Sequence, residues 1–294
     1  MITPWHQRIS AFLLAPEYPY GLAFLRIGIA LVGLIQLFFL VPYLDLLYGN
    51  YGLVQWAIIE TNPGEWFPSI GKLCLAAQPL GGLSSRTCVN GVFVVYALAL
   101  VGLLVGYQTR LFAILTWLTH GLTLNSGFFS LYGVDTMIHI CLFYFMWMPI
   151  GGAWSVDSRG RDVHPTAAAG LGLRVLQLHL CVIYFDAGIA KLQGEQWRTG
   201  EALWRTLMNP EFMVFDFSWL AHFPVLAAIA CWSVIIIEVG YAVFIWASKT
   251  RYLWIAATVG LHLGIGLMMG LWLFSITMIL MTVSAFGIPR YFRG

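Results

Sequence analysis

The chain has 294 residues, of which 60% are hydrophobic and 10% charged, with a mean hydropathy of +0.81 and a formal net charge of +2. Soluble domains carry about 25% charged residues, so this composition excludes them and indicates an integral membrane protein. The charged residues form no basic run, which excludes a nucleic-acid partner because such a partner needs a basic patch.

Apolar stretches recur along the whole chain. A bilayer core of about 30 Å is crossed by about 20 apolar residues, and the sequence predicts an all-α, polytopic transmembrane bundle of about eight spans in a single domain over residues 1–294. The expected spans are 22–44, 89–107, 111–124, 134–150, 171–191, 223–247, 252–270 and 271–287. The last two depend on a reversal at the cluster Gly264, Gly266 and Gly270. A kinked single helix there would leave seven spans.

Basic residues favour one orientation of these spans, because Lys and Arg collect in cytoplasmic loops. With both termini cytoplasmic, the outer loops hold few basic residues and the inner side holds most of them. The inner set is Arg8, Arg26, Arg110, Arg159, Arg161, Arg174, Lys249, Arg251, Arg290 and Arg293, and the outer set is Lys72, Arg86, Arg198 and Arg205. The two long connections, 45–88 and 193–222, then lie outside, where we expect them to form a cap.

Cys74 and Cys88 both lie in the first outer connection, in a compartment that permits disulfides. A disulfide between them and two free thiols both remain open on the sequence alone. Cys141, Cys181 and Cys231 lie within spans, where a cysteine is ordinarily a small buried hydrophobe. Because no paired His/Cys spacing occurs, we predict no metal site.

The fourth span carries Asp135 and His139, four residues apart and therefore on one helix face. Ionisable side chains inside a bilayer cost about 2.5 to 3.5 kcal/mol on insertion scales unless they are paired, so each needs an explanation. The carboxylate could orient the imidazole for chemistry, or the two could only tie helices together.

The fifth span is polar on two faces. One face carries Gln177, Cys181, Tyr184, Gly188 and Lys191, and the opposite face carries His179 and Asp186. We therefore expect this helix at the centre of the bundle. Lys191 follows Arg174 by roughly 26 Å at about 1.5 Å per residue, which places it near the outer edge of the hydrocarbon. It can snorkel to headgroups as an anchor, or act as a base if desolvation lowers its pKa.

Glu238 lies in the middle of the sixth span with no charged neighbour on its own helix, so its partner must come from another helix. His262 and Lys191 are the candidates by depth. Together with Asp135 and His139, these three residues form the predicted catalytic set.

One segment, YFDAGIAKLQGEQWRTGEAL (184–203), resembles the YFxAGxxKLxxxWxxG segment of vitamin K-dependent gamma-carboxylases and their bacterial relatives, the HTTM proteins. NSGFFSLYGVDTMIHICLFYFMWMPIGGAWSVD and GLHLGIGLMMGLWLFSITMI are similar to further segments of that family. The resemblance implies that Lys191 is the base that deprotonates reduced vitamin K or another quinol, before a glutamate is carboxylated. Tyr184, Gly188 and Trp197 would then bind the cofactor.

The chain departs from the carboxylases in two ways. Their large lumenal domain, which binds propeptide and substrate, has no counterpart in these residues, and Phe128 and Phe129 stand where the carboxylase has a histidine. A second branch, the bacterial sporulation-delaying toxin maturation proteins, is similar in size and works with a small partner subunit on a secreted peptide.

The leading hypothesis is a carboxylase-like membrane enzyme in the bacterial inner membrane, with its active face outward, acting on a reduced quinone or a peptide. The alternatives are a peptide-toxin maturation subunit with a small partner protein, and a non-enzymatic scaffold that binds lipid or quinone. A transporter is disfavoured, because the halves of the chain do not repeat.

Overall fold

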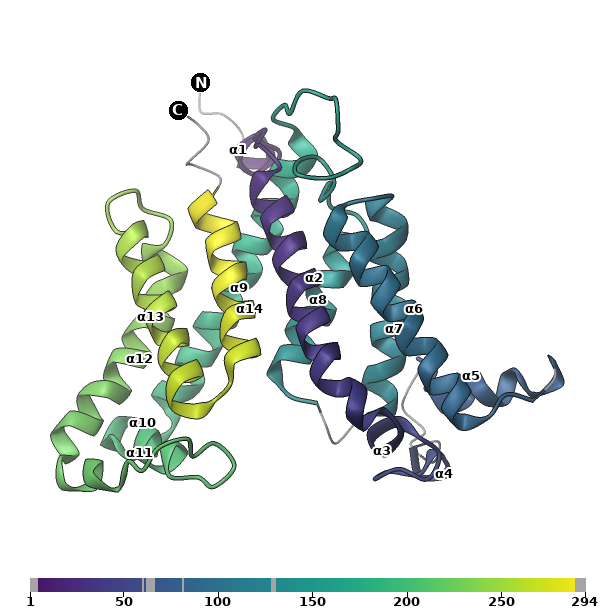
Figure 1. Ribbon diagram of the computed structural model, residues 1–294. Coiled ribbons are helices and arrows are strands. Elements are labelled where there is room, and N and C mark those ends of the chain that lie inside the picture. The colour runs from purple at the N-terminus through teal and green to yellow at the C-terminus, as the bar shows by residue number, and fades with distance from the viewer. Residues whose placement is uncertain (1–4, 60, 62–66, 81, 128–130, 289–294) are drawn as a thin grey trace. The chain divides into compact units, whose positions relative to one another are not determined.

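The computed structural model describes residues 5–59, 61, 67–80, 82–127 and 131–288, so Phe128 and Phe129 lie outside it. Within this part the regular structure is helical apart from one isolated antiparallel bridge between Glu17 and Thr166. The elements are α1 (Trp5–Leu13), α2 (Tyr20–Leu40), η1 (Val41–Tyr43), α3 (Leu44–Tyr48), α4 (Trp56–Ile59), α5 (Ile70–Ala76), η2 (Gln78–Leu80), α6 (Ser85–Val105), α7 (Thr109–Ser126), α8 (Gly133–Phe145), α9 (Ala167–Gln193), α10 (Glu195–Thr199), α11 (Glu201–Leu207), η4 (Ser218–His222), α12 (Pro224–Phe244), α13 (Arg251–Met269), α14 (Trp272–Thr282) and η5 (Val283–Gly287) (Figure 1).

A helix occupies each of the eight predicted ranges. Five described helical segments are long and apolar enough to cross a membrane: 20–48, 85–105, 167–193, 224–244 and 251–269. The helices α8 and α14 are apolar but shorter. The interior of α7 is more polar, and its hydroxyls at Thr116, Thr119 and Thr123 donate to carbonyls of their own helix, so they need no partner from another helix.

The predicted reversal between the last two helices is confirmed. Gly270 ends α13 in the left-handed conformation, with φ of +72°, which favours glycine. A Cβ atom on Gly266 would lie 2.9 Å from the Trp272 ring, so glycine there lets α14 fold back onto α13. Gly264 faces open space and contributes nothing to the turn.

The chain's contacts group its residues into two compact units. The first consists of residues 1–25 and 164–294 and holds α1 and α9 to η5, and we call it the α9 unit. The second, residues 26–163, holds most of α2 and the elements through α8, and we call it the α6 unit.

Arg26 ties the end of α6 to the connection after α8. Its guanidinium is fully buried and donates to the carbonyl oxygens of Leu103, Leu104, Ile150 and Trp154 at 2.5 to 3.1 Å. These carbonyls lie at the end of α6 and in the connection after α8, where backbone acceptors lack helical partners. From the sequence, Arg26 was expected only as one of the basic residues of the inner side. Its hydrogen bonds to these four carbonyl oxygens were not predicted.

Asp157, in the connection after α8, caps the start of α7. Its carboxylate accepts hydrogen bonds from the backbone nitrogens of Gln108 and Thr109, both at 2.8 Å, and from Thr109 Oγ1 at 2.9 Å. Partial burial opposes ionisation, but these bonds outweigh it and hold the pKa of the Asp157 carboxyl below its ordinary value. A negative charge there also complements the helix dipole.

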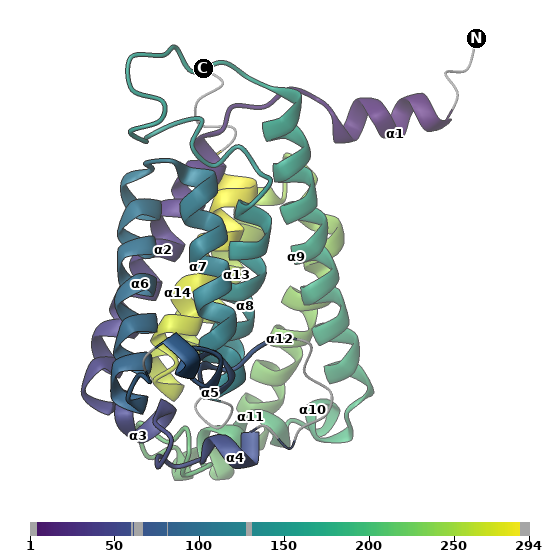
Figure 2. The ribbon, with the colours of Figure 1, turned by 90° about the vertical axis from the view of Figure 1, so that its right-hand side faces the viewer.

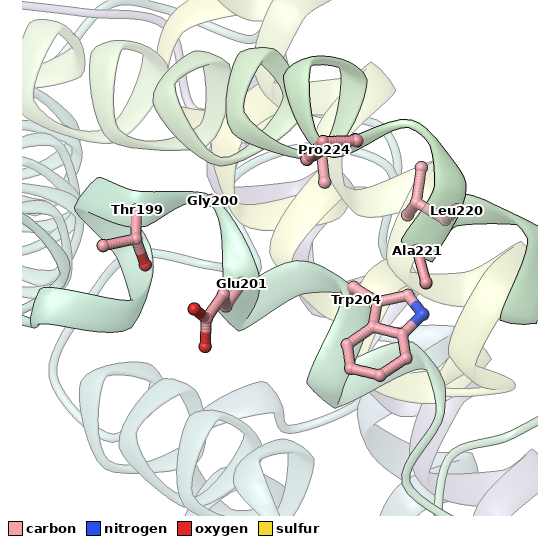
Figure 3. A pocket seen from close by; sticks show the side chains of 8 residues that line it. Thr199, Gly200, Glu201, Trp204, Leu220, Ala221 and Pro224 are labelled. Atoms are coloured by element: carbon pink, nitrogen blue, oxygen red, sulfur yellow. The ribbon is translucent and has the colours of Figure 1, made fainter.

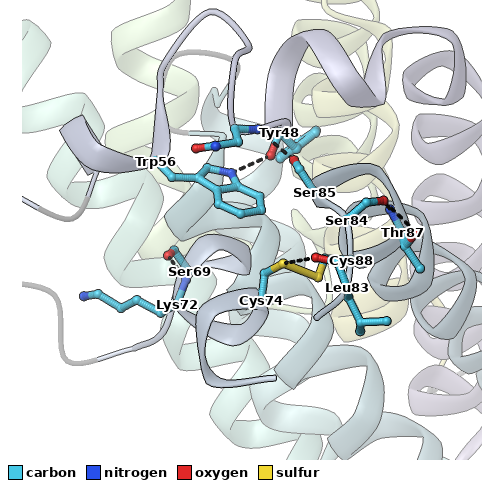
Figure 4. Close-up of a disulfide and its surroundings, with 11 residues drawn as sticks. Tyr48, Trp56, Ser69, Lys72, Cys74, Leu83, Ser84, Ser85, Thr87 and Cys88 are labelled. Carbon is cyan, nitrogen blue, oxygen red and sulfur yellow. Dashed lines mark hydrogen bonds between the residues drawn. A yellow bond between two sulfur atoms is a disulfide. The ribbon is translucent and has the colours of Figure 1, made fainter. Parts of the chain in front are cut away.

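The two long connections, 45–88 and 193–222, contain short helices of their own. In the α6 unit, Cys74 of α5 and Cys88 of α6 form a disulfide, with Cα atoms 5.8 Å apart (Figure 4). Trp56 packs beside it and donates from Nε1 to the carbonyl of Tyr48 at 2.9 Å. In the α9 unit, the connection 193–222 forms α10, α11 and η4.

Replacing Asp157 by asparagine should lower the unfolding midpoint near neutral pH, because one strong acceptor of the α7 cap is lost at about 1 kcal/mol. A carboxyl with a lowered pKa contributes stability that is present above its ordinary pKa and is lost as the pH falls through the lowered value. The difference between wild type and Asp157→Asn should therefore shrink in acid. Thermal unfolding over a pH series measures this, and a constant difference would contradict the role of the charge.

Serine at both Cys74 and Cys88 should loosen the first outer connection, since a disulfide that closes a loop of about 15 residues stabilises by about 3 kcal/mol. Trypsin should then cut faster after Lys72 and Arg86, which each lie two residues before a cysteine of the bridge. Cleavage after Arg205, exposed in the other outer connection, serves as the control and should not change. Equal rates at all three sites in both proteins would show that the bridge does not hold this connection.

Candidate functional site

Lys191 and Glu238 form an ion pair between α9 and α12. Nζ lies 2.9 Å from Oε1, with hydrogen-bond geometry, and 2.8 Å from Oε2. The exposed fractions of the two side chains are 23% and 10%. Lys191 therefore turns inward toward a carboxylate, and of the two candidate partners for Glu238 the structure has Lys191.

Gly188 brings the two helices close enough for this pair. It lies one turn before Lys191 on the same face of α9 and is buried. A Cβ atom there would lie 2.7 Å from Val239 Cγ2, 2.9 Å from Val239 N and 3.0 Å from Glu238 Cβ. Gly188, expected to bind a cofactor, thus lies against the α12 backbone, and any side chain there would separate the helices.

The Lys191–Glu238 pair lies away from the end at which α12 begins. Beyond the pair, α10 packs along α12 (Figure 2), and Gly200, with φ of +92°, lies against Ala228. Glu238 is roughly 15 Å from Ala228 at about 1.5 Å per residue. Exposed apolar side chains occur in that interval, among them Ile229, Trp232 and Ile236.

Trp197 of α10 covers the ammonium of Lys191. Its ring centroid lies 5.3 Å from Nζ, within the range of a cation–π contact. The helix α9 ends at Gln193, and α10 begins at Glu195 after Gly194, so Trp197 follows Lys191 by six residues. Trp197 is half-buried.

A second polar contact lies two turns before Lys191 along α9. The hydroxyl of Tyr184 is 2.8 Å from Nε2 of His262 on α13, and its ring packs against Tyr241 in a tilted arrangement with centroids 4.2 Å apart. His262 is buried beside Phe274 of α14. Of the two candidate partners for Glu238, His262 is therefore not the one observed, because Glu238 and His262 each have a different partner on α9.

The helix α9 does not have neighbours all round within its unit. It packs along α12, and its other side carries exposed Val182, Phe185 and Asp186. The expected central position is therefore not met within this unit.

Asp135 and His139 belong to the α6 unit and do not pair with each other. Asp135 accepts from Gln36 Nε2 at 2.6 Å and from the backbone nitrogen of Tyr132 at 2.9 Å, which makes it part of the cap of α8. His139 Nδ1 lies 3.2 Å from Nδ1 of His120 on α7. The expected carboxylate–imidazole pair is thus replaced by an amide–carboxylate contact and an imidazole pair.

His120 and Tyr241 were not singled out from the sequence. His120 lies among Thr116, Thr119 and Thr123, on a polar stripe of α7 that helical spacing could have indicated. Tyr241 follows Glu238 by three residues, and so shares its buried face.

A pocket of about 180 Å³ lies in the α9 unit between α10, α11, η4 and the start of α12 (Figure 3). Most of its lining is apolar. The lining residues are Thr199, Gly200, Glu201, Trp204, Leu220, Ala221, Pro224 and Ala227. Small-molecule sites usually measure about 300 to 1,000 Å³, so this one holds part of a ligand at most. In the described part of the chain, no group of three or more His, Cys, Asp or Glu side chains could hold a metal ion.

Comparison with known families gives one match. The model of a family described as the HTTM domain matches residues 82–288, which is more than half of the chain and includes the Lys191–Glu238 pair. No curated protein and no solved structure matches the chain.

Alanine at Gly188 should push α12 away from α9 and destabilise the protein, because overpacking costs about 1 to 3 kcal/mol. Alanine at Gly260 on α13 is the matched control. It also replaces a helical glycine, but its Cβ would meet nothing within 4 Å, so the gain of about 1 kcal/mol in helix propensity should remain.

Thermal unfolding in detergent should then rank Gly188→Ala below wild type, and Gly260→Ala level with it or above. Equal midpoints for the two variants would mean that the α9–α12 contact does not need a glycine.

Proposed function

Because this chain belongs to the HTTM domain family, we propose that it is a membrane enzyme with carboxylase-like chemistry in which Lys191 is the base. The substrate class is a reduced quinone, a peptide, or both together. The observation that carries this proposal is the inward position of Lys191, paired with Glu238 and covered by Trp197. A lysine that only anchored the helix end would extend its amine to headgroups.

Glu238 suits Lys191 as a partner for base chemistry. A protonated lysine cannot accept a proton, so the amine must first lose one. The carboxylate at 2.8 to 2.9 Å can take that proton without any movement of the helices. Lys191 Nζ is then neutral, with its lone pair available to a substrate hydroxyl or to an acidic C–H group.

A quinol fits part of this arrangement. Bound there, it would supply an acidic ring hydroxyl, which Lys191 could deprotonate. Trp197 would hold it by ring stacking, since its indole already lies over Nζ. The hydroxyl of Tyr184 is hydrogen-bonded to His262, and Gly188 packs against α12. These two residues would therefore support the site without touching the quinol. Of the three residues expected to bind the cofactor, Trp197 would be the one that contacts the quinol ring.

The proposal includes a topology. All eight helices cross the bacterial inner membrane, both termini are cytoplasmic, and the outer connections cover the external face. Lys191 is then reached from outside, past α10. The excess of basic residues on the inner side supports this orientation.

Two other functions share the same residues. As a scaffold for lipid or quinone, the chain would use Lys191–Glu238 and Tyr184–His262 only as interhelical ties. As a peptide maturation subunit with a small partner protein, it would use the same base on a peptide, and the exposed face of the outer connections would receive the partner.

Lys191→Arg separates a base from a tie. Arginine keeps a positive charge for Glu238 but does not deprotonate in proteins, so a tie tolerates the change and a base does not. Oxygen uptake with reduced vitamin K in proteoliposomes should fall about 10²- to 10⁴-fold, the usual contribution of a general base. Lys191→Ala should lose oxygen uptake to a similar extent. Lys249→Arg is the matched control and should retain full oxygen uptake. Full uptake in Lys191→Arg would end this proposal.

A further inference from the structure

Polar side chains recur along one face of α9 from end to end. Lys191, Tyr184 and Gln177 are seven residues apart, about two turns each, and Arg174 follows one turn beyond. The stretch from Arg174 to Lys191 covers about 26 Å at about 1.5 Å per residue, close to the thickness of about 30 Å of a bilayer core.

Each of these residues contacts a different segment of the α9 unit. Lys191 pairs with Glu238 and Tyr184 with His262. Gln177 Nε2 donates to the carbonyl of Ala285 in η5 at 2.6 Å. Arg174 donates to Gln177 Oε1 at 2.6 Å and lies 3.6 Å from Glu17. The α9 seam is this set of residues: Lys191, Glu238, Tyr184, His262, Gln177, Arg174 and Glu17.

Buried polar atoms without a partner belong to residues of the seam or to residues close to them in sequence. Among the described residues, Nδ1 of His262, Oγ1 of Thr258 and Oγ of Ser284 have no hydrogen-bond partner and are shielded from solvent. Thr258 lies one turn inward of His262, and Ser284 precedes Ala285. Leaving such a group unpaired costs about 1 to 3 kcal/mol, and buried water ordinarily occupies such places.

We propose that the α9 seam is a proton pathway that connects the Lys191–Glu238 pair with the inner end of α9. The inference rests on the proposed function, in which Lys191 must release the proton it takes from each substrate. That proton moves from Nζ to the Glu238 carboxylate, with one N–H bond broken and one O–H bond formed. The Glu238 carboxyl then gives this proton through intervening water to Tyr184, Tyr184 passes one to His262, and further waters release one to solvent at the end of α9 near Glu17. Each relay group accepts one proton and gives up another, so none of them changes its net protonation.

Few other titratable groups surround the pair. Inward of it lie His262 from α13 and Tyr241 from α12, while α14 and η5 contain no titratable residue. Glu195 and Arg198 of α10 are exposed, as is Asp186 on the opposite side of α9. The protonation of Lys191 therefore depends mainly on Glu238 and on whichever side of the membrane the pair exchanges protons with.

The chain offers a direct readout of this exchange, because its lysines are Lys72, Lys191 and Lys249 alone. The full-length protein is reconstituted in liposomes with different inner and outer pH and treated briefly with acetic anhydride, which acetylates neutral amines. Peptide mass spectrometry measures each lysine, and Lys72 and Lys249 report the orientation. Acetylation of Lys191 should rise up to about tenfold per unit of pH at the membrane side that holds Lys249.

Three variants sharpen the test. Tyr184→Phe and His262→Gln should abolish the response of Lys191 to the pH on the Lys249 side, since neither new side chain relays a proton, although glutamine can keep a hydrogen bond to Tyr184. Thr277→Val is the matched control, because that buried hydroxyl donates to Leu273 of its own helix, and it should behave as wild type.

Wild-type acetylation that follows the pH on the Lys72 side would overturn the pathway, and so would unchanged responses in Tyr184→Phe and His262→Gln. The measurement needs no substrate, so its failure is distinct from loss of the proposed enzymatic function, which Lys191→Arg tests by turnover.

Discussion

Polar groups inside an apolar helix bundle have no bulk water to bind, and the α9 unit is arranged around this constraint. Lys191 and Glu238 satisfy each other across α9 and α12. Removing one partner of such a pair leaves the other charge buried and costs about 3 to 5 kcal/mol. The pair therefore fixes which faces of α9 and α12 meet and the register of the two helices along their axes. This holds independently of any chemistry that the pair performs.

Glycines determine how closely those faces approach. Gly188 lies against Val239, and Gly200 lies against Ala228, so α12 runs past both α9 and α10 at backbone contact distance. This register has a consequence for the site. It carries α12 well beyond Lys191 alongside α10, and it brings the Trp197 ring of α10 over the ammonium. The amine thereby lies against a carboxylate and an indole.

Hydropathy predicted the positions of the eight helices because their apolar segments are long and separated by charged or glycine-containing turns. Residue partners were harder to predict, since they depend on how helices rotate and slide against one another. Glu238 had two candidates at similar depth, and only the α9–α12 register decides between them. Asp135 and His139 share a helix face, as predicted. However, Asp135 binds Gln36 and His139 contacts His120, both from other helices, so the two do not bind each other. Spacing within one helix contains no information about such partners from other helices.

A lysine–glutamate pair differs from a lone lysine in its cost of deprotonation. The charged pair and the neutral pair, an amine beside a carboxylic acid, have the same net charge, so moving the proton between them creates no net charge in an apolar medium. A lone lysine would have to send its proton to distant water. The same geometry serves a structural tie equally well. What separates a base from a tie is whether the proton can leave the pair, and the proton pathway proposed along α9 is the route by which it would leave.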